Sequence, residues 1–491
     1  MIPLSDVIPM GEWRPDLPDY LNPGSTEALN VLTKGGNYIP LKSLGEFSGA
    51  LPARCKGAFS FIASDGVSHS FAGTNSNLYK LNSDGITWDE VSKSTDAYTT
   101  AALGSWDFIA FGDRVIAANN ETILQSFIVG TDSAFSDLTG SPATQSLGII
   151  NNFVVTGNNV DNPTRVRWSA FDDPTSWTAS ATTQSDSQDL QDGGPVRALT
   201  GYQNYGVIFQ EKKIRRMEYV GPPEIFRFSV LEENRGTRIP RSIQAYGHLI
   251  FFLDEDGFYM FDGVKSIPIG HNKVDKYFLS QVDADYDTLI SSAIDPINKI
   301  VAWAFAGPNN SDGKNNRVII YNWADDRWTY SDEETQWLFP ALSLATNIES
   351  LDAIYGDLDS IPFSLDSKVF SGGSPLLAAF SENSKMGFFS GSNLAATVSS
   401  AEARLNPQGR SFVDAVLPVT DAASVTMDLG TRNLQSDSVS YTTGSAPSSI
   451  SGEAYFRSEA RFHRARVQIA AGTSWNQIQG VQFRAKPVGF R

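Results

Sequence analysis

The chain has 491 residues, a net charge of −17 from 38 basic and 55 acidic side chains, and one cysteine, Cys55. A single cysteine excludes an intrachain disulfide framework and a metal site built from several thiolates, and the acidic balance keeps a large protein soluble. No apolar run reaches the roughly 20 residues of a membrane-spanning helix. The first residues also lack a basic region followed by an apolar one, so we expect neither a membrane span nor a secretory signal peptide.

The first 51 residues are rich in proline and glycine and show little alternation of polar and apolar residues. This composition predicts an extended N-terminal arm over residues 1–51 rather than an independent core. Because the remaining length exceeds the usual size of one hydrophobic core, we expect at least two domains in the whole chain.

Short strands separated by turn sequences recur between residues 52 and 331. The clearest hairpin pairs residues 247–253 with residues 258–261 around the turn Asp254 to Gly257, where glycine supplies the positive φ angle. Similar hairpins are predicted at residues 70–88, 106–118, 149–169, 205–220 and 299–330. Repeated short strands of this kind indicate an all-β fold, an irregular β-propeller or a related radial arrangement. Short helices are predicted only at residues 274–281 and 399–405.

The pattern changes after residue 331. Residues 332–365 form a loose insertion that fits no motif, and residues 374–389 form a hairpin that closes the propeller, which therefore covers residues 52–403. Residues 404–491 alternate strictly in several segments and predict a small antiparallel β-sandwich-like domain with one solvated face. This last part has ten basic and six acidic residues, a net of +4, which leaves −21 for the preceding 403 residues. The asymmetry suggests two modules.

Motifs for catalysis and metal binding are missing from the sequence. The four histidines, His69, His248, His271 and His463, lie in different hairpins and never in a spacing that suits a metal. Neither a nucleophile elbow nor a phosphate-binding glycine loop is present. Pairs of carboxylates are frequent at predicted hairpin tips, where aspartates first of all form turns. We therefore predict no catalytic, cofactor-binding or metal-binding residues.

One basic cluster is dense enough to be a candidate site: Lys212, Lys213, Arg215 and Arg216. Lysine and arginine provide the sequence-independent part of nucleic-acid binding, so the cluster could contact DNA phosphates. It could equally pair with the acidic surface of a neighbouring subunit, or be a solvated hairpin tip that protects an edge strand. No aromatic residues are interleaved as in a single-strand stacking platform.

Several segments resemble a known family. Residues 235–263, RGTRIPRSIQAYGHLIFFLDEDGFYMFDG, are similar to the pattern R-G-x-x-x-P-x-S-x(4)-G-x-x-x-F-L-x-x-D-G-x-x-x-F-D-G of virion proteins of tailed phages. Residues 162–177 resemble the segment P-x-R-V-R-W-S…D-P-x-x-W of the same proteins, residues 30–40 their N-terminal arm, and residues 461–469 their last strands. The family comprises the tail nozzle or tail-hub proteins of short-tailed phages, also described as packaged-DNA stabilisation or tail tubular proteins.

The resemblance implies a propeller with accessory β-domains that assembles as a homohexamer, a sixfold ring below the portal and the head-to-tail adaptor. The expected role is a conduit and gate for double-stranded genomic DNA, bound without sequence specificity, in the tail of a virion assembled in the host cytoplasm. Tail fibre, spike or needle proteins are the other expected partners. An acidic lumen would repel DNA rather than trap it.

Two other functions remain open on the sequence. The chain could be a propeller glycan hydrolase or lyase that acts on a bacterial surface polysaccharide, which requires a cleft with convergent carboxylates. It could also be a monomeric carbohydrate-binding propeller, which the molecular mass in solution would separate from a hexamer.

Overall fold

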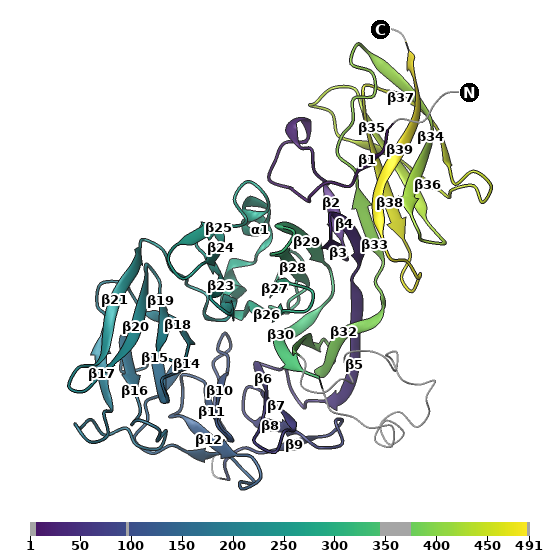
Figure 1. The fold of residues 1–491 in the computed structure, drawn as a ribbon. Coiled ribbons are helices and arrows are strands. Elements are labelled where there is room, and N and C mark those ends of the chain that lie inside the picture. Colours follow the sequence, from purple (N-terminus) through teal and green to yellow (C-terminus); the bar gives the residue numbers. More distant parts are fainter. Residues whose placement is uncertain (1–5, 95–97, 344–374, 489–491) are drawn as a thin grey trace.

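Two β-rich bodies make up the molecule, a ring of small sheets and a C-terminal domain that projects from it (Figure 1). The computed structural model describes residues 6–94, 98–343 and 375–488. Strands dominate these ranges, which contain a single α-helix, α1 (Asp275–Gln281), so the predicted all-β fold is confirmed. No helix within the described ranges has the length and apolar character needed to cross a bilayer.

Within the described residues, the ring consists of seven groups of four antiparallel strands. Six of them are separate sheets, and the group β26–β29 is one end of a nine-stranded sheet. The first four are β6 (Gly57–Ile62), β7 (Ser68–Gly73), β8 (Leu78–Leu81), β9 (Trp88–Glu90); β10 (Asp107–Phe111), β11 (Arg114–Ala118), β12 (Gln125–Ile128), β13 (Ser136–Asp137); β14 (Thr144–Ile150), β15 (Phe153–Asn159), β16 (Asn162–Trp168), β17 (Asp186–Asp189); and β18 (Val196–Gly201), β19 (Tyr205–Gln210), β20 (Lys213–Gly221), β21 (Ile225–Glu233). The others are β22 (Gln244–Tyr246), β23 (Leu249–Asp254), β24 (Gly257–Phe261), β25 (Ser266–Pro268); β26 (Ser291–Asp295), β27 (Ile300–Phe305), β28 (Arg317–Asn322), β29 (Arg327–Ser331); and β30 (Thr335–Leu342), β31 (Pro375–Ser381), β32 (Lys385–Asn393), β5 (Lys42–Ala50).

The first strands of successive sheets contact one another around a closed circle. β6 contacts β10, β10 contacts β14, β14 contacts β18, β26 contacts β30, and β30 returns to β6. Between the fourth and sixth sheets, the short 3-10 helix η2 (Pro240–Ser242) contacts β18, β23 and β26, and β22 contacts β26. The seventh sheet is unlike the rest because its outer strand, β5, comes from the N-terminal part of the chain.

The C-terminal domain packs two sheets face to face, as the alternating sequence predicts. One sheet holds β34 (Arg410–Thr420), β37 (Ala454–Ala460) and β39 (Ile478–Val488) together with β1 (Ile8–Pro9), β3 (Val31–Lys34) and β4 (Asn37–Pro40). The other holds β33 (Ala396–Ser399), β35 (Thr426–Arg432), β36 (Ser440–Ser445) and β38 (Phe462–Ile469), and it continues through β2 (Glu27–Leu29) into β29 of the ring. Val416 and Phe483 of the first sheet share one core with Met427 and Val467 of the second.

Some sequence predictions differ from the structure. Strand pairing crosses both predicted domain boundaries, because β5 joins the ring and β33 joins the C-terminal sheets. Residues 399–405 are not helical, because Ser399 is the last residue of β33 and Ala403 forms a β-bridge with His463. The predicted loose insertion contains β30, whose burial on both faces removes the alternation that marks a strand. The rest of that insertion, residues 344–365, lies outside the described residues.

The N-terminal segment fastens the two bodies to each other. Trp13 is 1% exposed and stacks on Tyr330 of the ring at 4.6 Å between ring centroids, with Tyr277 of α1 edge-on at 5.0 Å. A few residues later, the 3-10 helix η1 (Asp19–Leu21) places Asp19 against Arg464 of the C-terminal domain at 2.8 Å. The same short segment therefore binds the ring through an aromatic core contact and the C-terminal domain through ion pairs.

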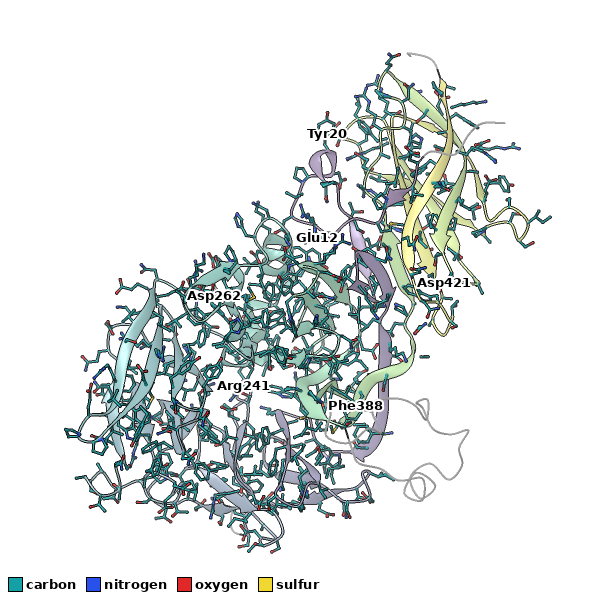
Figure 2. The ribbon with its side chains drawn as sticks, viewed as in Figure 1. Glu12, Tyr20, Arg241, Asp262, Phe388 and Asp421 are labelled. Atoms are coloured by element: carbon teal, nitrogen blue, oxygen red, sulfur yellow. The ribbon has the colours of Figure 1, made fainter. Side chains whose placement is uncertain are left out.

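Replacing Trp13 by alanine should lower the free energy of unfolding by about 3–5 kcal/mol, because it empties a large buried site at the junction. The matched control is Tyr20→Ala in the same segment, where the side chain is 63% exposed (Figure 2) and a change below about 0.5 kcal/mol is expected. Urea unfolding measures both. Equal effects of the two substitutions would show that the segment does not hold the junction.

Candidate functional site

The basic cluster lies at the turn between β19 and β20 and along β20. Lys213 Nζ lies 2.8 Å from Asp192 and 3.2 Å from Glu233, and the buried Arg215 pairs with Asp192 and donates to Gln210 Oε1 at 2.8 Å. Arg216 lies over the ring of Tyr205, at 4.3 Å, and 3.2 Å from Glu218. Lys212 is exposed, and its side chain has no ion pair among the described residues.

Three of the four predicted site residues are thus neutralised within their own sheet and its connecting loop. The hydrogen bonds to Asp192 and Glu233 raise the pKa of Lys213, and the bond from Lys213 lowers the pKa of Asp192. Asp192 belongs to the loop between β17 and β18, so the cluster ties β20 to the connection between two sheets. Contact of this cluster with DNA or with a neighbouring subunit stays a prediction. Since the other three side chains form ion pairs, Lys212 is the member of the cluster without one among the described residues.

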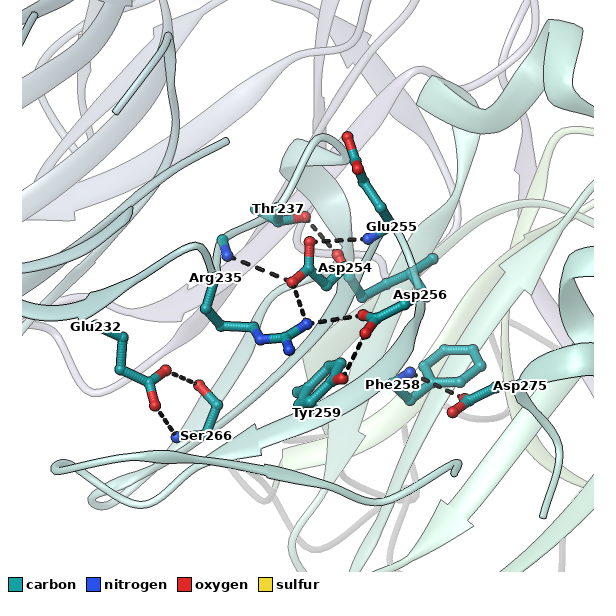
Figure 3. A network of polar contacts seen from close by, with 12 residues as sticks. Glu232, Arg235, Thr237, Asp254, Glu255, Asp256, Phe258, Tyr259, Ser266 and Asp275 are labelled. Carbon is teal, nitrogen blue, oxygen red and sulfur yellow. Dashed lines mark hydrogen bonds and ion pairs between the residues drawn. The ribbon is translucent and has the colours of Figure 1, made fainter. Parts of the chain in front are cut away.

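A second charged network lies in residues 235–263, the segment with the family pattern, here called the phage-like motif (Figure 3). Arg235 donates to Asp254 at 2.6 Å and to Asp256 at 2.7 Å, and its guanidinium lies 3.9 Å from the ring centroid of Tyr259. The Tyr259 hydroxyl in turn donates to Asp256 at 2.8 Å. Burial raises the pKa of Asp254. The network clamps the β23–β24 turn to the segment that follows β21.

Asp275, which the sequence analysis did not single out, is the buried carboxylate beside this network. Its Oδ1 accepts the backbone N–H of Phe258 at 3.0 Å, and burial raises its pKa to about 6. A Cβ on Gly257 would come within 2.2 Å of this carboxylate, and one on Gly270 within 1.9 Å. The two glycines therefore make room for the carboxylate, and they are the sequence signal that could have pointed to it.

The remaining carboxylates of the hairpin tips act as turn acceptors. Asp84 accepts the backbone N–H groups of Ile86 and Thr87 at 2.8 and 2.9 Å, and Asp173 accepts that of Thr175 at 2.9 Å. These bonds are the local geometry by which aspartate stabilises turns. In the part of the chain that the structure describes, no three His, Cys, Asp or Glu residues gather into a group that could hold a metal ion.

Arg241 lies near the centre of the ring (Figure 2). Arg241, on η2, forms an ion pair with Asp107 of β10 at 2.7 Å and donates to the carbonyl of Gln145 in β14 at 2.8 Å. Asp107 also accepts the backbone N–H of Leu147 at 2.8 Å. A cavity of about 230 Å³ surrounds these groups and is lined by the first strands of the sheets. Arg241 therefore links the second and third sheets to the connection that precedes the fifth.

Comparisons with known proteins assign no family. No family model matches the chain, and no curated protein matches it. Among solved structures, the crystal structure of the computationally designed Ika8 protein is similar to 70% of this chain and all of its own, at 11% identity and a TM-score of 0.37. A score this low carries no conclusion about fold or function.

Replacing Arg241 by methionine should lower the free energy of unfolding by about 3 kcal/mol, because it leaves the Asp107 carboxylate, whose side chain is only 17% exposed, without its partner. The double variant Arg241→Met/Asp107→Asn should recover most of this loss, since an asparagine oxygen still accepts from Leu147 and no charge remains. Urea unfolding of both variants measures the difference. A double variant as unstable as the single one would contradict a role for the ion pair at the axis.

Proposed function

We propose that this chain is the tail nozzle or tail-hub protein of a short-tailed phage, and that its ring of sheets is a seven-bladed β-propeller. In this proposal β5 closes the propeller as the outer strand of the last blade, and the C-terminal domain is an accessory module. The protein is a structural component of the virion rather than an enzyme. It assembles as a homohexamer on the head-to-tail adaptor and carries the fibre, spike or needle proteins.

The observation that carries the proposal is the mutual contact of the two halves of the phage-like motif. Arg235 of its first half pairs with Asp254 and Asp256 of its second half, and the backbone N–H of Leu253 donates to the Ser242 hydroxyl at 3.3 Å. A Cβ on Gly236 would meet the carbonyl oxygen of Gln210 at 2.0 Å. The residues that resemble the family are thus the ones that hold the connection after β21 against the β23–β24 turn. This agreement supports a shared fold rather than a chance similarity.

The narrow centre of the ring supports a conduit formed between subunits. Because the first strands enclose a cavity of only about 230 Å³, which Arg241 also lines, double-stranded DNA has no path through a single subunit. A lumen enclosed by several copies around a common axis provides one. The acidic charge of residues 1–403 then keeps the passing DNA from adhering to most of the lumen wall.

The glycan hydrolase or lyase alternative requires carboxylates free to act on a sugar. At the hairpin tips, Asp84, Asp173, Asp254 and Asp256 are already engaged by backbone groups, hydroxyls or Arg235. Because these carboxylates are already hydrogen-bonded or ion-paired, a structural role is favoured over glycan hydrolysis or cleavage. A polysaccharide lyase or hydrolase activity lost on replacing one carboxylate would reverse that preference.

Quantitative mass spectrometry of purified particles tests the proposed function. We expect about six copies of this chain in each virion, in line with one closed ring, and release of the chain together with the adaptor when tails are detached. Particles that lack the chain should lose packaged DNA. Presence of the protein in infected cells but not in particles would refute the proposal.

A further inference from the structure

The surplus positive charge of the C-terminal domain is concentrated in a few unpaired side chains. Most of its arginines are engaged: Arg432 with Glu402, Arg464 with Asp19, Arg466 with Glu27, Arg484 with Asp414 and Glu453, and Arg410 with Glu459. Four further cations are exposed and have no ion-pair partner within residues 6–94, 98–343 and 375–488. These are Arg404, Arg457, Arg461 and Lys486.

The four cations lie at one end of the domain, here called the distal rim. Lys486 of β39 and Glu459 of β37 both pair with Phe412 of β34, and Arg457 and Arg461 lie two residues on either side of Glu459. Arg404 directly follows Ala403, which forms a β-bridge with His463, and His463 lies two residues after Arg461 in the chain. Figure 1 shows this end, where β39 finishes, as the part of the domain farthest from the ring.

We propose that the distal rim binds the phosphate backbone of double-stranded DNA, an inference that rests on the proposed function as a DNA conduit. From the rise and spacing of strands, Arg457 and Arg461 stand at most about 13 Å apart, because Arg461 lies at the bend after β37, and Lys486 lies about 10 Å across two strands from Glu459. A patch of this size faces several phosphates of a duplex, which carries one charge per roughly 1.7 Å of its axis. The side chains recognise charge and not base sequence.

Local contacts hold the rim ready for an anion. The ammonium group of Lys486 lies 5.1 Å from the ring centroid of Phe412, which orients its stem along the sheet. The one carboxylate among the rim residues, Glu459, is already paired with Arg410 at 3.5 Å. Binding of a phosphate to cations without ion-pair partners costs little free energy, because no existing ion pair must break.

The rim fits DNA better than the cluster at residues 212–216, where Lys213 and Arg215 are held by Asp192. It also fits DNA better than a protein partner, because the centre of a protein interface is depleted in charged residues and enriched in aromatic and apolar ones. With −21 on residues 1–403 and +4 on the domain, the rim forms a narrow basic zone on an otherwise repelling molecule. In an assembled ring, one such zone from each copy would hold the DNA at one level without trapping it along its length.

Fluorescence anisotropy of a labelled 20-base-pair duplex, titrated with the purified full chain from 50 to 200 mM salt, tests the inference. Four phosphate contacts predict a slope of about −3.6 for the logarithm of affinity against the logarithm of salt, or roughly a hundredfold loss over this range. The variant Arg404→Gln/Arg457→Gln/Arg461→Gln/Lys486→Gln should bind at least tenfold more weakly at 50 mM salt, with a slope near zero.

The matched control is Lys34→Gln/Lys42→Gln/Lys265→Gln/Lys276→Gln, which removes the same charge from exposed lysines outside the rim and should keep wild-type affinity. Equal losses in both variants, or no loss in the rim variant, would overturn the inference. So would a rim variant that binds DNA normally but loses self-association in sedimentation, since the partner would then be a second copy. The binding assay uses the purified chain and needs no particle. A negative result would therefore refute the rim as a DNA site, while the copy number in virions tests the proposed function separately.

Discussion

The ring depends on one long-range strand pairing, between β5 and β32. Residues 42–50 reach this position from the N-terminal segment, more than three hundred residues before the strand they pair with. Without β5 the seventh sheet would expose an unpaired edge and the ring would lack its outer closing strand, which sheets of this kind avoid. The segment that precedes β5 is held by the C-terminal domain through β1, β3 and β4. The same N-terminal segment therefore both closes the ring and attaches the second domain.

Charges inside the ring follow from this architecture. Each sheet must be joined to the next by loops and tight turns, and Arg235, Arg241 and Lys213 each bind carboxylates at such a joint. The pairs Arg235–Asp254 and Arg241–Asp107 are largely shielded from solvent. Breaking either would leave a poorly solvated charge, so these pairs fix geometry more than they add stability. At the distal rim, by contrast, four exposed cations without an ion pair in the described residues lie close together. Cations that pair with carboxylates in the ring are therefore assigned to the scaffold, and the unpaired cations of the distal rim to the proposed DNA contact.

The sequence predicted local features well and distant ones poorly. The hairpin of β23 and β24 follows from the turn Asp254 to Gly257 and from the alternation around it, and residues 274–281 differ from α1 by one residue. Pairing of Lys213 and Arg215 with Asp192 was not predictable, because the partners come from a loop about twenty residues earlier. The same holds for β5, whose partner strand β32 lies more than three hundred residues later in the chain. Asp275 was missed because an aspartate at a helix start does not by itself indicate burial, and the glycines that make room for it, Gly257 and Gly270, precede the helix.

Hydrogen exchange of the native protein tests the central claim, that β5 is an integral part of the closed ring. Peptides covering β5, β31 and β32 would be followed by mass spectrometry at neutral pH in increasing denaturant. The account predicts that the amides of β5 exchange in the same cooperative opening as those of β31 and β32, with equal free energies of opening. Exchange of β5 at a much lower free energy, while β31 and β32 stay protected, would contradict it.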